Sequence, residues 1–175
     1  MNTFMDPQTL VDEFGLTQGM SVADFGAGIG ALTVPLARIV GTHGSVYAIE
    51  VQKELLATIT KNTEHLESVH VIWGDIERPG ATKIADATVD AVVLANTLFQ
   101  VEDKKGCLSE ATRVLKHSGK IIIIDWTDSF GGMGPHVNHI VPVSVVEKML
   151  TDMGYIKVKD IPAGSHHFGI IFRKG

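Results

Sequence analysis

The sequence has little of three things that would point to particular kinds of protein. Its single cysteine, Cys107, excludes an internal disulfide and a cysteine-based metal site. No apolar run approaches the roughly 20 residues that a membrane-spanning helix needs. Residues 1–8 show no basic segment followed by an apolar one, the pattern of an export signal. We therefore expect a cytoplasmic protein with no membrane span.

A basic patch is also missing. The chain has 15 Lys and Arg against 20 Asp and Glu, a net charge of −5, and its basic residues are scattered. Because affinity for nucleic acid depends on neutralising phosphates, this distribution argues against a nucleic-acid partner. What is present is a globular composition, 45% hydrophobic and 20% charged over 175 residues, and we expect residues 1–175 to form a single domain.

Apolar, strand-like runs alternate with helix-like patterns along most of the chain. Strands are expected at 21–25, 45–50, 69–75, 89–95 and 120–126, and helices at 7–14, 31–40, 51–66 and 103–115. The run 89–95 is apolar almost throughout, which is typical of a parallel strand covered on both sides. In the turn before the fifth strand, Gly119 is expected to cap the preceding helix in the left-handed conformation. The order predicts an α/β fold with a parallel sheet between two layers of helices.

The end of the chain has a different pattern. A helix is expected at 143–154, followed by strands at 155–161 and 168–174. The connection between these two strands is too short for a crossover, so they should form an antiparallel hairpin at the end of the sheet.

Three acids lie at the ends of the first three expected strands: Asp24, Glu50 and Asp75. Ligands of open parallel sheets bind at the carboxyl ends of the strands. Any one of these acids could instead cap a helix. Three acids at one edge of a sheet favour a shared ligand.

The stretch VADFGAGIG, residues 22–30, combines a glycine-rich turn with an acid. Gly26, Gly28 and Ala31 satisfy a loose dinucleotide-binding pattern, and Glu50 lies at a suitable distance to bind ribose hydroxyls. Asp24 would repel a pyrophosphate, whereas it would attract an ammonium or a sulfonium group. The sequence therefore favours S-adenosylmethionine, a cation that contains adenosine and no phosphate.

These motifs resemble the class I S-adenosylmethionine-dependent methyltransferases, from about Phe4 to the end of the chain. The matching segments are VADFGAGIG (22–30), AIE (48–50), GDI (74–76), VDAVVLANTLFQV (89–101) and RVLKHSGKIIIIDW (113–126). The resemblance implies a Rossmann-like, doubly wound, mostly parallel seven-stranded sheet with an antiparallel C-terminal hairpin strand. It is nearest to the small-molecule branch that includes quinone and arsenite methyltransferases. Arsenite is rejected as a substrate, because that activity depends on several cysteines.

The resemblance and the residues together define an expected cofactor site. Its members are Asp24, Gly26, Ala27, Gly28, Gly30, Glu50, Val51, Asp75, Ile76 and Asn96. Asp75 would accept a hydrogen bond from the adenine amino group, with Ile76 packed on the ring. Asn96 would bind the ammonium group or orient the acceptor; its alternative is a plain strand terminus. No metal ligand is assigned.

Four of the eight histidines fall near the C-terminus: His136, His139, His166 and His167. If the last strand is antiparallel, these side chains could gather over the methyl group, where one could take a proton from the acceptor. His167 is the first candidate for this catalytic role and His166 the second. Solvent-facing histidines without a role are the alternative. Trp126 either walls an aromatic acceptor or belongs to the core.

The expected function is transfer of a methyl group to a small, aromatic or quinone-like acceptor by in-line displacement, with catalysis mainly by positioning. Few residues precede the first strand, so the acceptor pocket should be open, closed by residues 128–141, or completed by a second subunit in a homodimer. The alternatives are an RNA or protein methyltransferase, a nicotinamide-dependent oxidoreductase, and a domain that binds S-adenosylmethionine without catalysis.

Overall fold

The computed structural model describes residues 6–130, 132 and 134–175. Residues 1–5, with Phe4, and positions 131 and 133 of the expected closing segment lie outside the described part. The helices are α1 (Pro7–Asp12), α2 (Thr33–Val40), α3 (Lys53–Thr63), α4 (Lys104–Val114), the short 3-10 turn η1 (Val137–His139) and α5 (Val143–Asp152). The strands are β1 (Ser21–Phe25), β2 (Ser45–Glu50), β3 (Val69–Trp73), β4 (Val89–Ala95), β5 (Leu115–Trp126), β6 (Tyr155–Ile161) and β7 (His167–Lys174).

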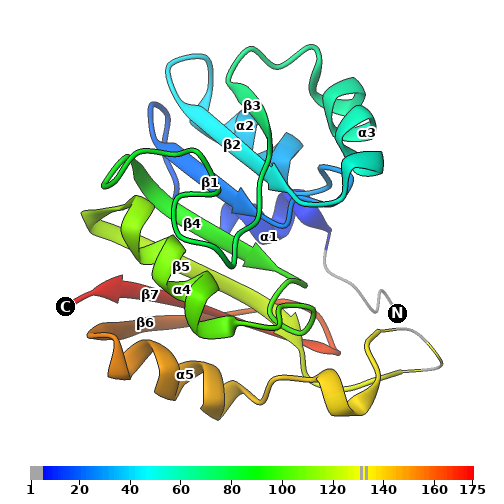
Figure 1. Ribbon diagram of the computed structural model, residues 1–175, viewed down its shortest axis with the longest axis vertical. Coiled ribbons are helices and arrows are strands. Elements are labelled where there is room, and N and C mark those ends of the chain that lie inside the picture. Colours follow the sequence, from blue (N-terminus) through cyan, green and yellow to red (C-terminus); the bar gives the residue numbers. More distant parts are fainter. Residues whose placement is uncertain (1–5, 131, 133) are drawn as a thin grey trace.

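All seven strands form one sheet in the order β3-β2-β1-β4-β5-β7-β6. Strands β1 to β5 pair in parallel, and β7 runs antiparallel to both β5 and β6. The C-terminal hairpin thus closes one end of the sheet, with β7 inserted next to β5 and β6 at the edge (Figure 1). This arrangement confirms the expected doubly wound fold.

Helices cover both faces of the sheet. Figure 1 shows α4 and α5 in front of the sheet and α1 and α2 behind it. Alternation along β5 explains the two layers, since Ile121 and Ile123 pack in the cluster that includes α4 and α5, while Ile122 and Ile124 pack with α1 and α2. Among the residues that the structure describes, no helix is both long and apolar enough to cross a membrane.

The expected left-handed helix cap at Gly119 is wrong. Leu115 is already extended, with φ −80° and ψ 130°, so β5 starts directly at the end of α4. The expected turn corresponds to an irregularity within β5, because Leu115 pairs with Val89 and Lys120 with Ala91, which leaves residues 116–119 out of register with β4. Gly119 is absent from the residues with positive φ among those described. A Cβ at Gly119 would lie 2.5 Å from the side chain of Leu115, so the glycine serves close packing instead of a left-handed cap.

A buried ion pair joins α4 to the loop between β3 and β4. The Glu110 carboxylate accepts hydrogen bonds from Gly80 N at 2.9 Å, Thr82 Oγ1 at 2.5 Å and Arg113 Nε at 2.8 Å. Arg113 Nη2 also donates to Ile84 O at 2.8 Å. Burial alone would raise the pKa of Glu110, but the hydrogen bonds and the charge of Arg113 lower it to about 2. Glu110 therefore stays ionised and fixes this loop against the helix.

We expect Glu110→Ala to lower the free energy of unfolding by roughly 3 kcal/mol, because loss of one partner leaves a partly buried charge and several donors without their acceptor. Chemical denaturation measures the change. The control is Glu147→Ala, which breaks the surface pair with Lys157 and should cost less than about 1 kcal/mol. An equal loss of unfolding free energy in the two variants would show that the buried ion pair stabilises the fold no more than a surface pair does.

Candidate functional site

Two adjoining hollows lie at the carboxyl ends of the central strands. The first hollow, about 300 Å³, lies between the end of β2 and the loop after β3, and its lining includes Glu50 and Asp75. The second hollow, about 290 Å³, lies at the ends of β1 and β4, and its lining includes Asp24 and Asn96. Residues Gly26, Gly28 and Gln100 line both hollows. The two spaces therefore meet at the glycine turn.

The turn after β1 requires glycine for two reasons. Gly26 and Gly28 have φ values of 76° and 58°, in the left-handed region. Gly26 N and Ala27 N both donate to Ile49 O at 3.0 Å, which ties the turn to β2. A Cβ at Gly26 would lie 2.9 Å from Thr97 Oγ1. The turn thus packs directly against the residues that follow β4, and no side chain fits between them.

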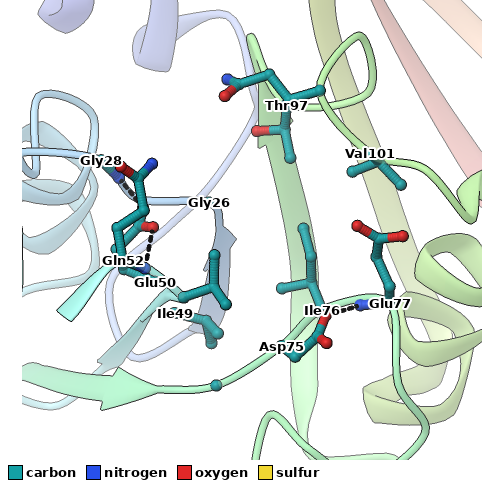
Figure 2. Close-up of a pocket in the computed structure, with 13 residues that line it drawn as sticks. Gly26, Gly28, Ile49, Glu50, Gln52, Asp75, Ile76, Glu77, Thr97 and Val101 are labelled. Atoms are coloured by element: carbon teal, nitrogen blue, oxygen red, sulfur yellow. Dashed lines mark hydrogen bonds between the residues drawn. The ribbon is translucent and has the colours of Figure 1, made fainter.

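Glu50 is held by backbone groups at the wall of the first hollow. Its Oε2 accepts a hydrogen bond from Gly28 N at 2.9 Å, and its Oε1 accepts one from Gln52 N at 2.9 Å. Figure 2 shows this carboxylate on one side of the hollow and Ile76, Glu77 and Val101 on the other. Because each carboxylate oxygen can accept a further hydrogen bond, Glu50 is placed to bind ligand hydroxyls.

Asp24 lies on β1 and is only 2% exposed. Its Oδ2 accepts a hydrogen bond from Thr33 Oγ1, at 2.7 Å, at the start of α2. Burial raises the pKa of Asp24 to about 6. At neutral pH the carboxylate is mostly ionised, so the second hollow carries a buried negative charge that favours a cation.

Asp75 lies in the loop after β3, since β3 ends at Trp73 and not at residue 75 as expected. Asp75 Oδ1 accepts a hydrogen bond from Glu77 N at 2.9 Å, which turns the chain away from the strand. Glu77 Oε2 in turn accepts a hydrogen bond from Asp103 N, at 2.6 Å, just before α4. The first hollow is therefore bounded by a loop that is fixed to α4.

Asn96 ends β4 in the left-handed region, with φ of 53°. Its N donates to Ile124 O at 2.8 Å, and its O accepts a hydrogen bond from Gln100 Nε2 at 2.8 Å. The next residue, Thr97, donates from Oγ1 to Phe25 O at 3.0 Å. These bonds keep the residues after β4 close to the glycine turn.

The structure brings together every expected cofactor residue except Gly30. Gly30 lies outside both hollows, at the turn into α2, where a Cβ would be 3.5 Å from Ile59. Sequence reasoning missed several lining residues: Gln52, Glu77, Thr97, Gln100 and Val101. Their position in the sequence could have indicated them, because each of these residues follows the end of β2, β3 or β4 by only a few residues.

The two expected catalytic histidines lie at the sheet edge but away from both hollows. His166 and His167 are at the start of β7, and β7 is separated from β4 by β5. The His166 Nδ1 atom lies 2.5 Å from Asp128 Oδ1, and its ring stacks on Phe130 with centroids 4.4 Å apart. His166 thus fixes the segment that follows β5, and its catalytic role stays a prediction.

His167 packs against Trp126, with ring centroids 4.1 Å apart. Burial lowers the pKa of His167, so the neutral imidazole is favoured. Trp126 is 8% exposed, and a Cβ at Gly134 would lie 2.8 Å from its ring. Trp126 was expected either to line the acceptor site or to belong to the core, and the structure supports the core position. Within residues 6–130, 132 and 134–175, no group of three or more His, Cys, Asp or Glu could hold a metal ion.

Comparison with known families gives a direct match to this architecture. A family model described as a methyltransferase domain matches residues 16–158, which include the glycine turn and the loops of both hollows. The chain belongs to the methyltransferase family. This methyltransferase is an enzyme that uses S-adenosylmethionine, and the buried acids and glycine turn of the two hollows fit that cofactor.

Individual relatives agree with the family. A probable cobalt-precorrin-6B C(15)-methyltransferase (decarboxylating) of Sulfurisphaera tokodaii is 27% identical over 154 residues, which cover 84% of this chain and 78% of that protein. The ubiquinone/menaquinone biosynthesis C-methyltransferase UbiE of Klebsiella pneumoniae is 28% identical over 121 residues, covering 67% of this chain and 47% of that protein. The methyltransferase thus spans about half the length of the quinone-related relative.

Among solved structures, an S-adenosylmethionine-dependent methyltransferase from Aquifex aeolicus superimposes with a TM-score of 0.87 at 30% identity. The match covers 98% of this chain and 90% of that one. The agreement extends over the whole sheet, including the C-terminal hairpin.

We expect Gly26→Ala to weaken binding of S-adenosylhomocysteine at least tenfold, because the new methyl group would displace Thr97 and the residues after it. The matched control is Gly19→Ala, whose φ of 83° is also left-handed but whose Cβ would meet nothing within 4 Å. Both variants carry the backbone strain of roughly 1 to 2 kcal/mol, so only Gly26→Ala should change the affinity measured by calorimetry. If both glycine variants lose affinity, the cause is a general loss of protein stability and not the contact with Thr97.

Proposed function

We propose that this enzyme transfers the methyl group of S-adenosylmethionine to a small, aromatic or quinone-like acceptor. The observation that carries the proposal is the charge of the two hollows. Buried Asp24 and Glu50 flank the glycine turn, and no Lys or Arg of the described residues lines either hollow. A pyrophosphate would meet repulsion and no compensating cation there, which argues against a nicotinamide cofactor.

The two hollows divide the cofactor between them. In the first hollow Glu50 accepts hydrogen bonds from the ribose hydroxyls and Asp75 accepts one from the adenine amino group, with Val51 and Ile76 as apolar contacts. In the second hollow Asp24 attracts the ammonium group, and the backbone at the start of α2 favours the carboxylate. Gly26 and Gln100 line both hollows and would therefore lie beside the sulfonium that joins these two parts.

The bound cofactor supplies an electrophilic methyl carbon. It would give this carbon to a nucleophilic atom of the acceptor, and the sulfur would be the leaving group that keeps the electron pair. The protein's own residues hold the two reactants in line and exclude water, and correct positioning alone can be worth about 7 to 11 kcal/mol. For His166 and His167, we propose a proton-accepting role only toward an acceptor that extends over β5.

The names of the two relatives support a small-molecule acceptor. One refers to cobalt-precorrin-6B and the other to ubiquinone and menaquinone biosynthesis, and both specify a C-methyltransferase. The net charge of −5 argues against RNA as the acceptor. We therefore place the acceptor among small ring compounds.

We expect Asp24→Ala and Glu50→Ala each to weaken binding of S-adenosylhomocysteine more than about tenfold, since a hydrogen bond to a charged group contributes roughly 1.5 to 3 kcal/mol. Calorimetry measures the affinity, and NADH should give no binding heat to the unmodified protein. Glu67→Ala, which removes an exposed acid outside both hollows, serves as the control. Unchanged affinity in both site variants, or tight binding of NADH, would overturn the proposed function.

Cofactor affinity should also depend on pH through Asp24. The pKa of about 6 means that its charge is present above that pH and is lost as pH falls through it. Affinity for S-adenosylhomocysteine is therefore expected to fall between pH 7 and pH 5, with proton release on binding in this range. Asp24→Asn should bind weakly with little change over the same range. A pH dependence that persists unchanged in Asp24→Asn would assign it to another group.

A further inference from the structure

A third hollow adjoins the two that are assigned to the cofactor. It measures about 550 Å³ and lies between the residues after β4 and the segment from η1 into α5. Phe99, Gln100 and Val101 line it on the side of β4, and His139, Ile140 and Val145 line it on the side of α5. Gln100 and Val101 also line the first hollow, so the two spaces lie on either side of these residues.

Gln100 is the residue at which all three hollows meet. It lines the first, second and third hollows, and its Nε2 donates to Asn96 O at 2.8 Å. If adenosine occupies the first hollow and the methionine part the second, the sulfonium lies beside Gln100. A molecule in the third hollow then reaches the methyl group at the same residue.

We propose that the third hollow is the acceptor site and that Gln100 positions the acceptor against the methyl group. This proposal rests on the proposed function, because the location of the sulfonium follows from it. The wall is firmly held, since Phe99 N donates to Asp125 Oδ2 at 3.2 Å and so ties the residues after β4 to the end of β5. The amide of Gln100 has both donor and acceptor atoms, which suits a hydroxyl or carbonyl group.

The polarity of the side chains that line the third hollow indicates which class of molecule it could bind. Six of its eleven lining residues are apolar, and Val145, on α5 beside this space, is 43% exposed. The lining also contains one acid, Glu102, one histidine, His139, and Lys104, whose Nζ donates to Val101 O at 2.7 Å. The volume lies within the roughly 300 to 1,000 Å³ of small-molecule pockets. The hollow therefore fits a small ring compound that carries a hydroxyl or carbonyl group.

The first test measures binding of 2-naphthol to the protein saturated with S-adenosylhomocysteine. Val145→Trp and Asn138→Trp each place an indole at the lining of the third hollow and should weaken 2-naphthol binding at least tenfold, while affinity for S-adenosylhomocysteine changes less than twofold. Val137→Trp is the control, because this side chain is 65% exposed and does not line the hollow. It should bind 2-naphthol as the unmodified protein does.

The second test isolates Gln100 by comparing 2-naphthol with naphthalene, which lacks the hydroxyl group. Gln100→Ala should reduce the preference for 2-naphthol at least fivefold. Gln18→Ala should keep the preference, because Gln18 is exposed and lines none of the three hollows.

The outcomes separate the two proposals. If S-adenosylhomocysteine fails to bind, the proposed function is wrong. If S-adenosylhomocysteine binds but 2-naphthol does not bind, or binds equally well to both tryptophan variants, the assignment of the third hollow is wrong. If Gln100→Ala still prefers 2-naphthol over naphthalene as the unmodified protein does, Gln100 does not position the acceptor.

Discussion

The site depends on keeping negative charge on two buried side chains beside the glycine turn. Asp24 and Glu50 are 2% and 4% exposed, yet each is stabilised by donors from its surroundings, the Thr33 hydroxyl for Asp24 and two backbone N–H groups for Glu50. Burial of an acid costs free energy unless hydrogen bonds or an opposite charge compensate it. The raised pKa of Asp24 shows that its compensation is incomplete in the protein alone. In the proposed function a cationic ligand would complete it, which would couple the electrostatics of the turn to cofactor binding.

Helix α4 organises the walls around this charge. Its Glu110 and Arg113 hold the loop that follows β3, and the Asp103 amide just before it binds Glu77. Gln100 lies in the connection between β4 and the same helix. The loop after β3 and the connection after β4 are thus both attached to α4. A shift of α4 would therefore move the walls of the first and third hollows together.

The histidines illustrate the difference between a shared edge and a shared site. The antiparallel last strand does start at the edge where β5 ends, as expected, with His167 opposite Trp126. Adjacent strands are about 4.8 Å apart, so β7 lies roughly 10 Å from β4 across the sheet. His166 therefore contacts the segment after β5 and His167 contacts Trp126 at the end of β5, whereas His139 lines the third hollow. Strand order, and not edge alone, decides which side chains can meet.

The sequence by itself determined the alternation of strands and helices, the reversed last strand, and the acids and glycines at the strand ends. These are local or periodic features: an apolar run such as 89–95 must be covered on both faces, and a short connection such as 162–166 can only join antiparallel strands. Only the tertiary structure decided that Gly119 lies within β5, that Gly30 faces α3, and that Gln100 joins three hollows. Those facts depend on which distant segments pack together, such as the contact between Gly26 and Thr97, and no local pattern encodes such a distance.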